Sequence, residues 1–194
     1  IVRPFYRRWD EAAFKNYVDR FQLPLKKPIK NLSKGMKMKF SLAIALSHHA
    51  ELLIMDEPTS GLDPIIRAEF LDILQSFIED ENKAVFFSTH ITSDLDKVAD
   101  YITLIDDGEI ILSKTKDELL EEYCLVKGSN DKLEYLPKES IVGIKQHAFG
   151  FEALSSNRKN IAKTMGDSVV IEKPTLEDIM LFSTKGGKPY AASY

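Results

Sequence analysis

The feature that most constrains the fold of this chain is the run LLIMDEPTSGLD at residues 52–63. Four apolar residues end in two consecutive carboxylates and are followed by small and polar residues. An apolar run this short is typical of a strand buried on both faces of a parallel sheet rather than of a helix. Because α/β sheets bind ligands at the carboxyl ends of their strands, the run predicts a ligand site at Asp56 and Glu57.

Two adjacent carboxylates at a strand end suit phosphoryl transfer. Side chains alternate along a strand, so Asp56 and Glu57 point in different directions. One carboxylate can hold magnesium, while the other orients or deprotonates the attacking water. The alternative is that both acids only cap the following loop, but the complete twelve-residue run favours the chemical interpretation.

An upstream pattern, LSKGM at residues 32–36, predicts the start of a helix that carries Ser33 and Gly35. The first backbone N–H groups of a helix are unpaired, and the helix dipole is positive at that end. Such a helix start attracts an anion such as a terminal phosphate. By itself the pattern is more typical of an ordinary serine helix cap.

A downstream pattern, FFSTH at residues 86–90, ends a second apolar strand with His90, 33 positions after Glu57. An imidazole at this edge can hydrogen-bond a phosphate oxygen and distinguish ATP from ADP. The alternative for a histidine at a strand end is a structural role. The other histidines, His48, His49 and His147, have no comparable context.

Together these segments resemble the ABC family of ATPases, over about residues 1–123. The run at 52–63 is similar to the family's Walker B and D-loop segment, LSKGM to its signature sequence, and His90 to its switch histidine. The family's commonest third and fifth signature residues are Gly and Gln, where this chain has Lys34 and Met36. We assign no catalytic role to Lys34.

The resemblance implies that the cofactors are ATP and Mg²⁺. It implies that Asp56 holds the metal, usually through water, that Glu57 is the general base, and that His90 contacts the γ-phosphate. The residues that would contact the nucleotide or the opposing subunit are Ser33, Gly35, Ser60, Gly61 and Asp63.

The resemblance also implies partners and a location. A second ATP-binding subunit would pack head to tail, with ATP between the two copies. The helical portion around residues 9–39 would pass the motion to transmembrane permease subunits, and nucleic acid is not an expected partner. The protein would be cytoplasmic and peripheral, on the inner face of the cell membrane.

The phosphate-loop pattern G-x-x-x-x-G-K-[ST] occurs nowhere in the 194 residues. In the family this loop, Walker A, precedes the signature helix. We therefore expect a truncated ATPase that lacks its N-terminal Walker A part and has no ATPase activity alone. Two other functions stay open: a soluble ABC-type ATPase associated with ribosomes or DNA, and a non-catalytic interaction fragment.

The expected fold class is α/β, a P-loop NTPase-like (ABC ATPase) core, incomplete at the N-terminus, with a helical subdomain and a small C-terminal α+β lobe. We expect a helical and signature subdomain at 1–50, the ATPase core at 51–123 and an accessory lobe at 124–194. The predicted elements are a three-turn helix after Trp9, helices at 34–49, 65–79, 93–99 and 115–123, strands at 52–55, 84–88 and 101–106, a hairpin turn at Asp107-Gly108, and a helix capped near Thr175.

Charge is distributed unevenly along the chain. Residues 1–39 hold 11 Lys and Arg against 3 acids, a net charge of +8, whereas the whole chain carries −4. Such a block suits phosphates, lipid head groups or an acidic partner, or is simply a solvated face. The longest stretch without a charged residue has 11 residues, against the roughly 20 that span a bilayer. The single Cys124 fits a reducing cytosol.

Overall fold

The structure is a computed structural model that describes residues 3–184. The chain divides into two compact units, residues 1–94 and 95–194. Residues 1–2 of the predicted subdomain at 1–50 and residues 185–194 of the predicted lobe at 124–194 lie outside the described residues. The division into parts at 1–50, 51–123 and 124–194 remains a prediction.

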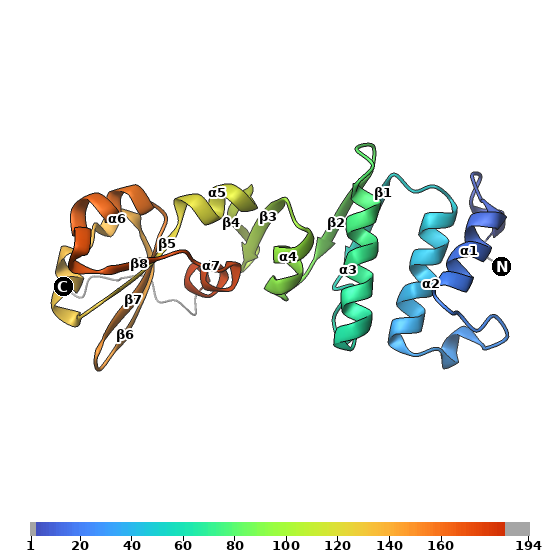
Figure 1. Ribbon diagram of the computed structural model, residues 1–194, viewed down its shortest axis with the longest axis horizontal. Helices are drawn as coiled ribbons and strands as arrows, with labels where there is room; N and C mark the ends of the chain where they lie inside the picture. The colour runs from blue at the N-terminus through green and yellow to red at the C-terminus, as the bar shows by residue number, and fades with distance from the viewer. Residues whose placement is uncertain (1–2, 185–194) are drawn as a thin grey trace. The chain divides into compact units, whose positions relative to one another are not determined.

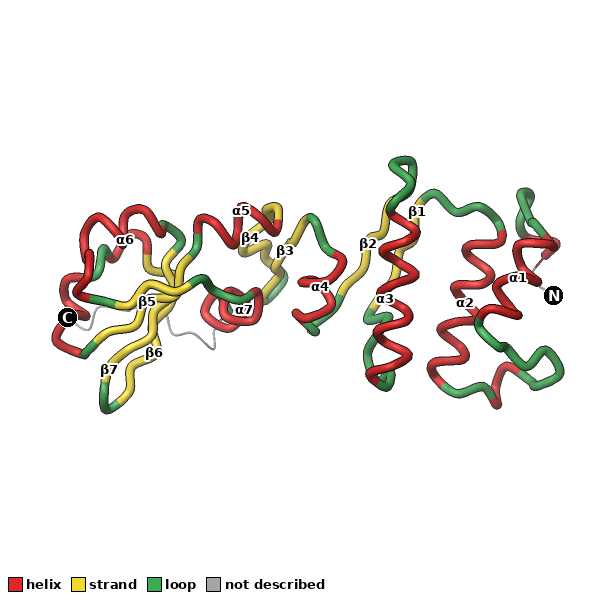
Figure 2. Tube along the Cα trace, in the orientation of Figure 1, coloured by secondary structure: helices red, strands yellow, loops and turns green. Residues whose placement is uncertain are grey.

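The first unit holds the two α-helices α1 (Glu11–Arg20) and α2 (Lys34–Ser47), followed by a strand, a helix and a second strand (Figures 1 and 2). The predicted helices and strands of this unit are confirmed, with ends shifted by a few residues. Its elements are η1 (Arg3–Phe5), α1 (Glu11–Arg20), η2 (Ile29–Asn31), α2 (Lys34–Ser47), β1 (Leu52–Asp56), α3 (Pro64–Ile78), β2 (Ala84–Ser88) and the start of α4 (Thr92–Val98).

Each long helix of the first unit begins at a side chain that caps it. Asp10, Ser33 and Asp63 accept hydrogen bonds from backbone N–H groups of the first turns of α1, α2 and α3. At Asp10 the hydrogen bond from the Ala13 amide is the main cause that lowers the pKa of the carboxyl. Polar residues at the predicted starts therefore fix where these helices begin.

Aromatic contacts join α1 to α2. The Phe14 ring meets Phe40 edge to face, with 6.5 Å between centroids. Tyr6, before α1, stacks on His48 at 4.2 Å. The first contact joins the two helices directly, and the second joins the segment before α1 to the residue that follows α2.

The strands β1 and β2 are parallel, with Ile54 opposite Phe86 and Asp56 opposite Ser88. The prediction that the first strand is buried on both faces is wrong, because Ile54 is 72% exposed; Phe86 of β2 is 68% exposed as well. Helix α3 packs against β2. Alternate side chains point to opposite faces, so one helix layer buries Leu53 and leaves Ile54 in solvent.

The second unit begins with an antiparallel hairpin and continues into a four-stranded antiparallel sheet of order β6-β7-β5-β8. Asp107 and Gly108 both have positive φ, which confirms the predicted hairpin turn. The elements are β3 (Tyr101–Asp106), β4 (Glu109–Thr115), α5 (Lys116–Glu122), β5 (Cys124–Gly128), η3 (Asn130–Tyr135), η4 (Lys138–Ser140), β6 (Ile141–His147), β7 (Gly150–Ser155), α6 (Arg158–Met165), η5 (Gly166–Ser168), β8 (Val170–Glu172) and α7 (Leu176–Ser183).

Strand β5 contributes side chains to both cores of the second unit. Leu125 packs with residues of α5 and α7, and Cys124 and Val126 pack with residues of α6. Burial raises the pKa of the Cys124 thiol. The predicted capping box at Thr115 and the predicted cap at Thr175 are both confirmed. None of the helices within residues 3–184 has the length and hydropathy needed to cross a membrane.

Replacing Leu154, a fully buried residue of β7, tests this core. We expect Leu154→Ala to lower the free energy of unfolding by about 3 kcal/mol, because it removes buried methyl groups and leaves a cavity. The matched control is Ile110→Ala in the exposed part of β4, with an expected change within about 0.5 kcal/mol. Urea unfolding followed by circular dichroism measures both; equal effects would contradict the assignment of Leu154 to the core.

Candidate active site

The carboxyl ends of β1 and β2 meet at one edge of their sheet, because the two strands are parallel and in register. The Ser88 hydroxyl donates a hydrogen bond to Asp56 Oδ1 at 2.5 Å. The end of β2 therefore fixes the orientation of the carboxylate at the end of β1. Ser88 was missed from the sequence, because the register that pairs it with Asp56 cannot be read from either strand alone.

Glu57 leaves β1 through a left-handed backbone conformation, with φ of +45°. Such a conformation costs a non-glycine residue of the order of 1–3 kcal/mol. The Glu57 N–H donates to the backbone carbonyl and to the hydroxyl of Ser88, at 3.1 and 3.2 Å. The end of β2 thus also holds the turn that aims the Glu57 side chain.

The side chains of Glu57 and His90 are in direct contact. Glu57 Oε1 lies 2.9 Å from His90 Nδ1, and the two side chains are 37% and 69% exposed. Glu57 Oε2 is buried and has no hydrogen-bond partner among the described residues. A buried oxygen without a partner is costly, so it is available to accept a proton or a hydrogen bond.

The structure therefore brings Asp56, Glu57 and His90 to one sheet edge, as their spacing predicts. Within residues 3–184, no group of three or more His, Cys, Asp and Glu side chains is arranged to hold a metal ion. Mg²⁺ is usually bound by one or two carboxylates, with water and substrate phosphates as further ligands. The oxygens of Asp56 and Ser88 fit an ion of this kind that arrives with a nucleotide.

The start of α2 lies against the start of α3. Ser33 Oγ accepts from the Met36 N–H at 3.2 Å, so Ser33 is a helix cap in the free chain. A Cβ atom at Gly35 would lie 3.1 Å from Ile66 Cγ2, which leaves little room for a larger residue. Lys34 lies over Gly61, where an added Cβ atom would be 2.9 Å from Nζ.

The turn between β1 and α3 carries the remaining predicted residues. Ser60 N–H donates to the Glu57 carbonyl at 3.2 Å, and Gly61 has φ of +68°. Asp63 caps α3 by accepting from the Ile66 N–H at 3.1 Å. The predicted residues thus form two groups. Asp56, Glu57 and His90 make up the first, and Ser33 and Gly35, near this turn, make up the second. Among the described residues no hydrogen bond joins the two groups.

A buried carboxylate behind the site was not predicted. Asp94, in the first turn of α4, accepts from Thr59 Oγ1 at 2.5 Å and from Arg67 Nε at 2.6 Å. The sequence contains a weak signal for it, since an acid sits in a first helical turn four residues after His90. No sequence pattern pairs it with Thr59 or Arg67, because these come from other segments.

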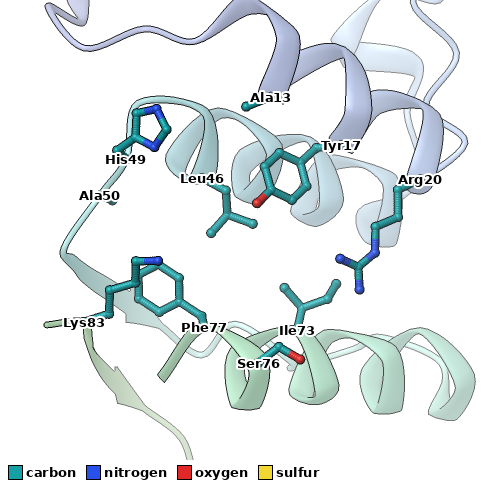
Figure 3. Close-up of a pocket in the computed structure, with 10 residues that line it drawn as sticks. All are labelled: Ala13, Tyr17, Arg20, Leu46, His49, Ala50, Ile73, Ser76, Phe77 and Lys83. Atoms are coloured by element: carbon teal, nitrogen blue, oxygen red, sulfur yellow. The ribbon is translucent and has the colours of Figure 1, made fainter. Parts of the chain in front are cut away.

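A pocket of about 200 Å³ in the first unit is lined by none of the predicted site residues. Figure 3 shows the side chains that line it. Its lining combines apolar side chains such as Leu46 and Phe77 with Arg20 and Lys83, and the Lys83 ammonium sits 5.3 Å from the Phe77 ring centre. Ligand pockets are usually roughly 300–1,000 Å³. The size of this pocket therefore does not favour a nucleotide.

The chain is similar to several known proteins. A family model described as "AAA domain, putative AbiEii toxin, Type IV TA system" matches residues 5–96. The lantibiotic transport ATP-binding protein SrtF of Streptococcus pyogenes is 46% identical over 99 residues, which are 50% of this chain and 43% of that protein. A putative ABC transporter ATP-binding protein of Mycoplasma pneumoniae is 32% identical over 179 residues, or 88% of this chain and 53% of that protein.

A solved structure shares the fold. The inward-facing conformation of a putative metal-chelate type ABC transporter aligns with a TM-score of 0.50 at 20% identity, over 77% of this chain and 58% of its own. The chain is therefore an α/β protein with the P-loop NTPase fold of ABC ATPases. The chain is a homologue of ABC transporter ATP-binding proteins, and it spans about half the length of the curated relatives that it matches.

Two substitutions of Glu57 test the strain in the turn. Glu57→Gly and Glu57→Ala remove the same side-chain contacts, but only glycine adopts φ of +45° without a steric penalty. We expect the glycine variant to be more stable than the alanine variant by about 1 kcal/mol. The single Trp9 lies in the first unit, so its fluorescence during urea unfolding measures the difference. Equal stabilities would mean that the turn stores no strain.

Proposed function

We propose that this chain is the part of an ATP-hydrolysing subunit of an ABC transporter that carries the signature, Walker B, D-loop and switch histidine. One observation carries the proposal: the Glu57–His90 contact stands beside the Asp56–Ser88 hydrogen bond at the carboxyl ends of two parallel strands. Phosphoryl transfer uses a carboxylate that holds Mg²⁺ and a second group that orients or deprotonates the attacking water.

Each residue at the sheet edge has a defined task in this proposal. Asp56 binds Mg²⁺, usually through water, with its orientation fixed by Ser88. Glu57 accepts the proton of the attacking water. His90 orients the Glu57 carboxylate from Nδ1 and, when both ring nitrogens carry a proton, also donates from Nε2 to a γ-phosphate oxygen. Bound Mg²⁺ neutralises charge that develops on the transferred phosphoryl group.

The second group of residues acts across an interface in this proposal. Ser33 and Gly35 begin a 14-residue helix whose first amides have no intrahelical partner. They contact the γ-phosphate bound by a second, head-to-tail subunit, and Ser60, Gly61 and Asp63 face that subunit. Two equivalent sites follow if the two copies are related by a two-fold axis.

The assembled protein lies, in this proposal, on the inner face of the membrane, where it drives transmembrane permease subunits. ATP favours the closed pair and hydrolysis releases it, so that binding energy is converted into motion of the permease. The P-loop lysine comes from outside residues 1–194, because these residues do not contain its pattern.

The first test asks whether residues 1–194 hydrolyse ATP alone. We expect no phosphate release above background and no difference between this chain and its Glu57→Gln variant, because the phosphate cradle is supplied from elsewhere. A colorimetric phosphate assay with Mg²⁺ and ATP measures both. If the chain hydrolyses ATP and Glu57→Gln abolishes this activity, the proposal that the phosphate loop is supplied from elsewhere is refuted.

The second test uses the assembled ATPase that includes a phosphate loop. We expect Glu57→Gln to lower kcat by roughly 100-fold or more, because it removes the base while keeping size and hydrogen bonding. Filter binding of labelled ATP should persist. The matched control is Glu81→Gln, an exposed acid before β2, with unchanged kcat. A Glu57→Gln enzyme of normal kcat would exclude Glu57 as the base.

A further inference from the structure

Asp94 is a fully buried carboxylate that joins three segments of the first unit. It accepts hydrogen bonds from Thr59 Oγ1 at 2.5 Å and from Arg67 Nε at 2.6 Å. Arg67 Nη2 also donates to Ser93 Oγ, at 2.5 Å. We call Thr59, Arg67, Ser93 and Asp94 the Asp94 clamp.

The clamp joins the two turns that carry the candidate catalytic pair. Thr59 lies two residues after Glu57 in the turn that follows β1, and Asp94 lies four residues after His90 in the first turn of α4. Arg67 comes from α3, which begins directly after the first turn. A change at Asp94 therefore acts on both turns at once, at the level of their backbones.

The exposed pair is too weak to hold the two turns by itself. Ion pairs between solvent-exposed side chains contribute only about 0–1 kcal/mol, and the Glu57 and His90 side chains are 37% and 69% exposed. The clamp is different, because Asp94 is 0% exposed and both its oxygens are hydrogen-bonded. Charge-assisted hydrogen bonds to a buried carboxylate also fix direction, since Arg67 contacts Asp94 and Ser93 together.

We propose that Asp94 is a positioning residue that sets the distance between Glu57 and His90 through Thr59 and Arg67. Asp94 touches neither of the two side chains and acts only through the turns that carry them. The proposal rests on the proposed function for its catalytic meaning. Its geometric content, that the clamp holds the Glu57–His90 contact, stands independently of ATP hydrolysis.

The experiment measures the Glu57–His90 hydrogen bond directly in residues 1–194. The ¹⁵N chemical shift of His90 Nδ1, assigned with His90→Gln and recorded at one fixed pH, reports this contact, and Glu57→Ala supplies the value for a broken contact. We expect Asp94→Asn to move the shift more than half of the way to that value. A second variant, Thr59→Val, removes only the clamp hydroxyl and should move the His90 shift part of the way. Thr59→Ser keeps a hydroxyl and should give the shift of the unchanged chain.

The matched control breaks another ion pair of the same unit. Lys39 Nζ lies 2.7 Å from Glu69 Oε2, between α2 and α3, and neither residue belongs to either turn. Glu69→Gln should leave the His90 shift unchanged. The proposal is overturned if Thr59→Val leaves the shift at its original value, or if Glu69→Gln moves it as far as Thr59→Val does, because the effect would then be a general loss of stability.

A kinetic readout separates this proposal from the proposed function. In the assembled ATPase, Thr59→Val should lower kcat by roughly 10-fold and leave the KM for ATP within about two-fold, because misplacement of a catalytic group slows chemistry more than it weakens binding. If Thr59→Val changes the His90 shift but leaves kcat normal, the claim that the clamp affects catalysis is overturned. An assembled protein without ATPase activity would refute the proposed function and leave the His90 result to decide on the clamp.

Discussion

The candidate site depends on the parallel register of β1 and β2. Because Asp56 pairs with Ser88 in that register, residues 32 positions apart in the chain end at the same sheet edge. Glu57 is then the first residue beyond β1, and its amide is held by Ser88. A register shifted by one residue would turn these side chains to the opposite face and separate the groups.

At this sheet edge the Glu57–His90 contact is partly exposed, whereas the hydrogen bonds that fix the two turns are buried. The Glu57–His90 contact faces solvent, and one Glu57 oxygen has no hydrogen-bond partner among the described residues. Behind it, Asp94 is fully buried with both oxygens bonded. The strained backbone at Glu57 persists because Ser88 on one side and the Thr59–Asp94 bond on the other hold the turn.

The exposed face of the β1–β2 pair shows how far one layer of helices can bury a sheet. Ile54 and Phe86 face solvent, although both lie in apolar runs of the kind found in strands covered on two sides. In the second unit, Tyr101 and Ile105 of β3 are exposed in the same alternating way. The exposed apolar face of the β1–β2 pair is unusual for a free surface, and its burial by further protein would be favourable.

Local signals in the sequence determined the main elements of residues 11–123 and placed Glu57 and His90 at strand ends. Capping residues such as Asp10, Ser33 and Thr115 fixed helix starts, and apolar runs ending in Asp56 and before His90 fixed two strand ends, because these features depend only on neighbours in the chain. Tertiary structure alone decided that one sheet face is exposed, that Ser88 orients Asp56, and that Asp94 binds Thr59 and Arg67. Those contacts join segments about 30 residues apart, and periodicity within one segment carries no information about which distant side chain it meets.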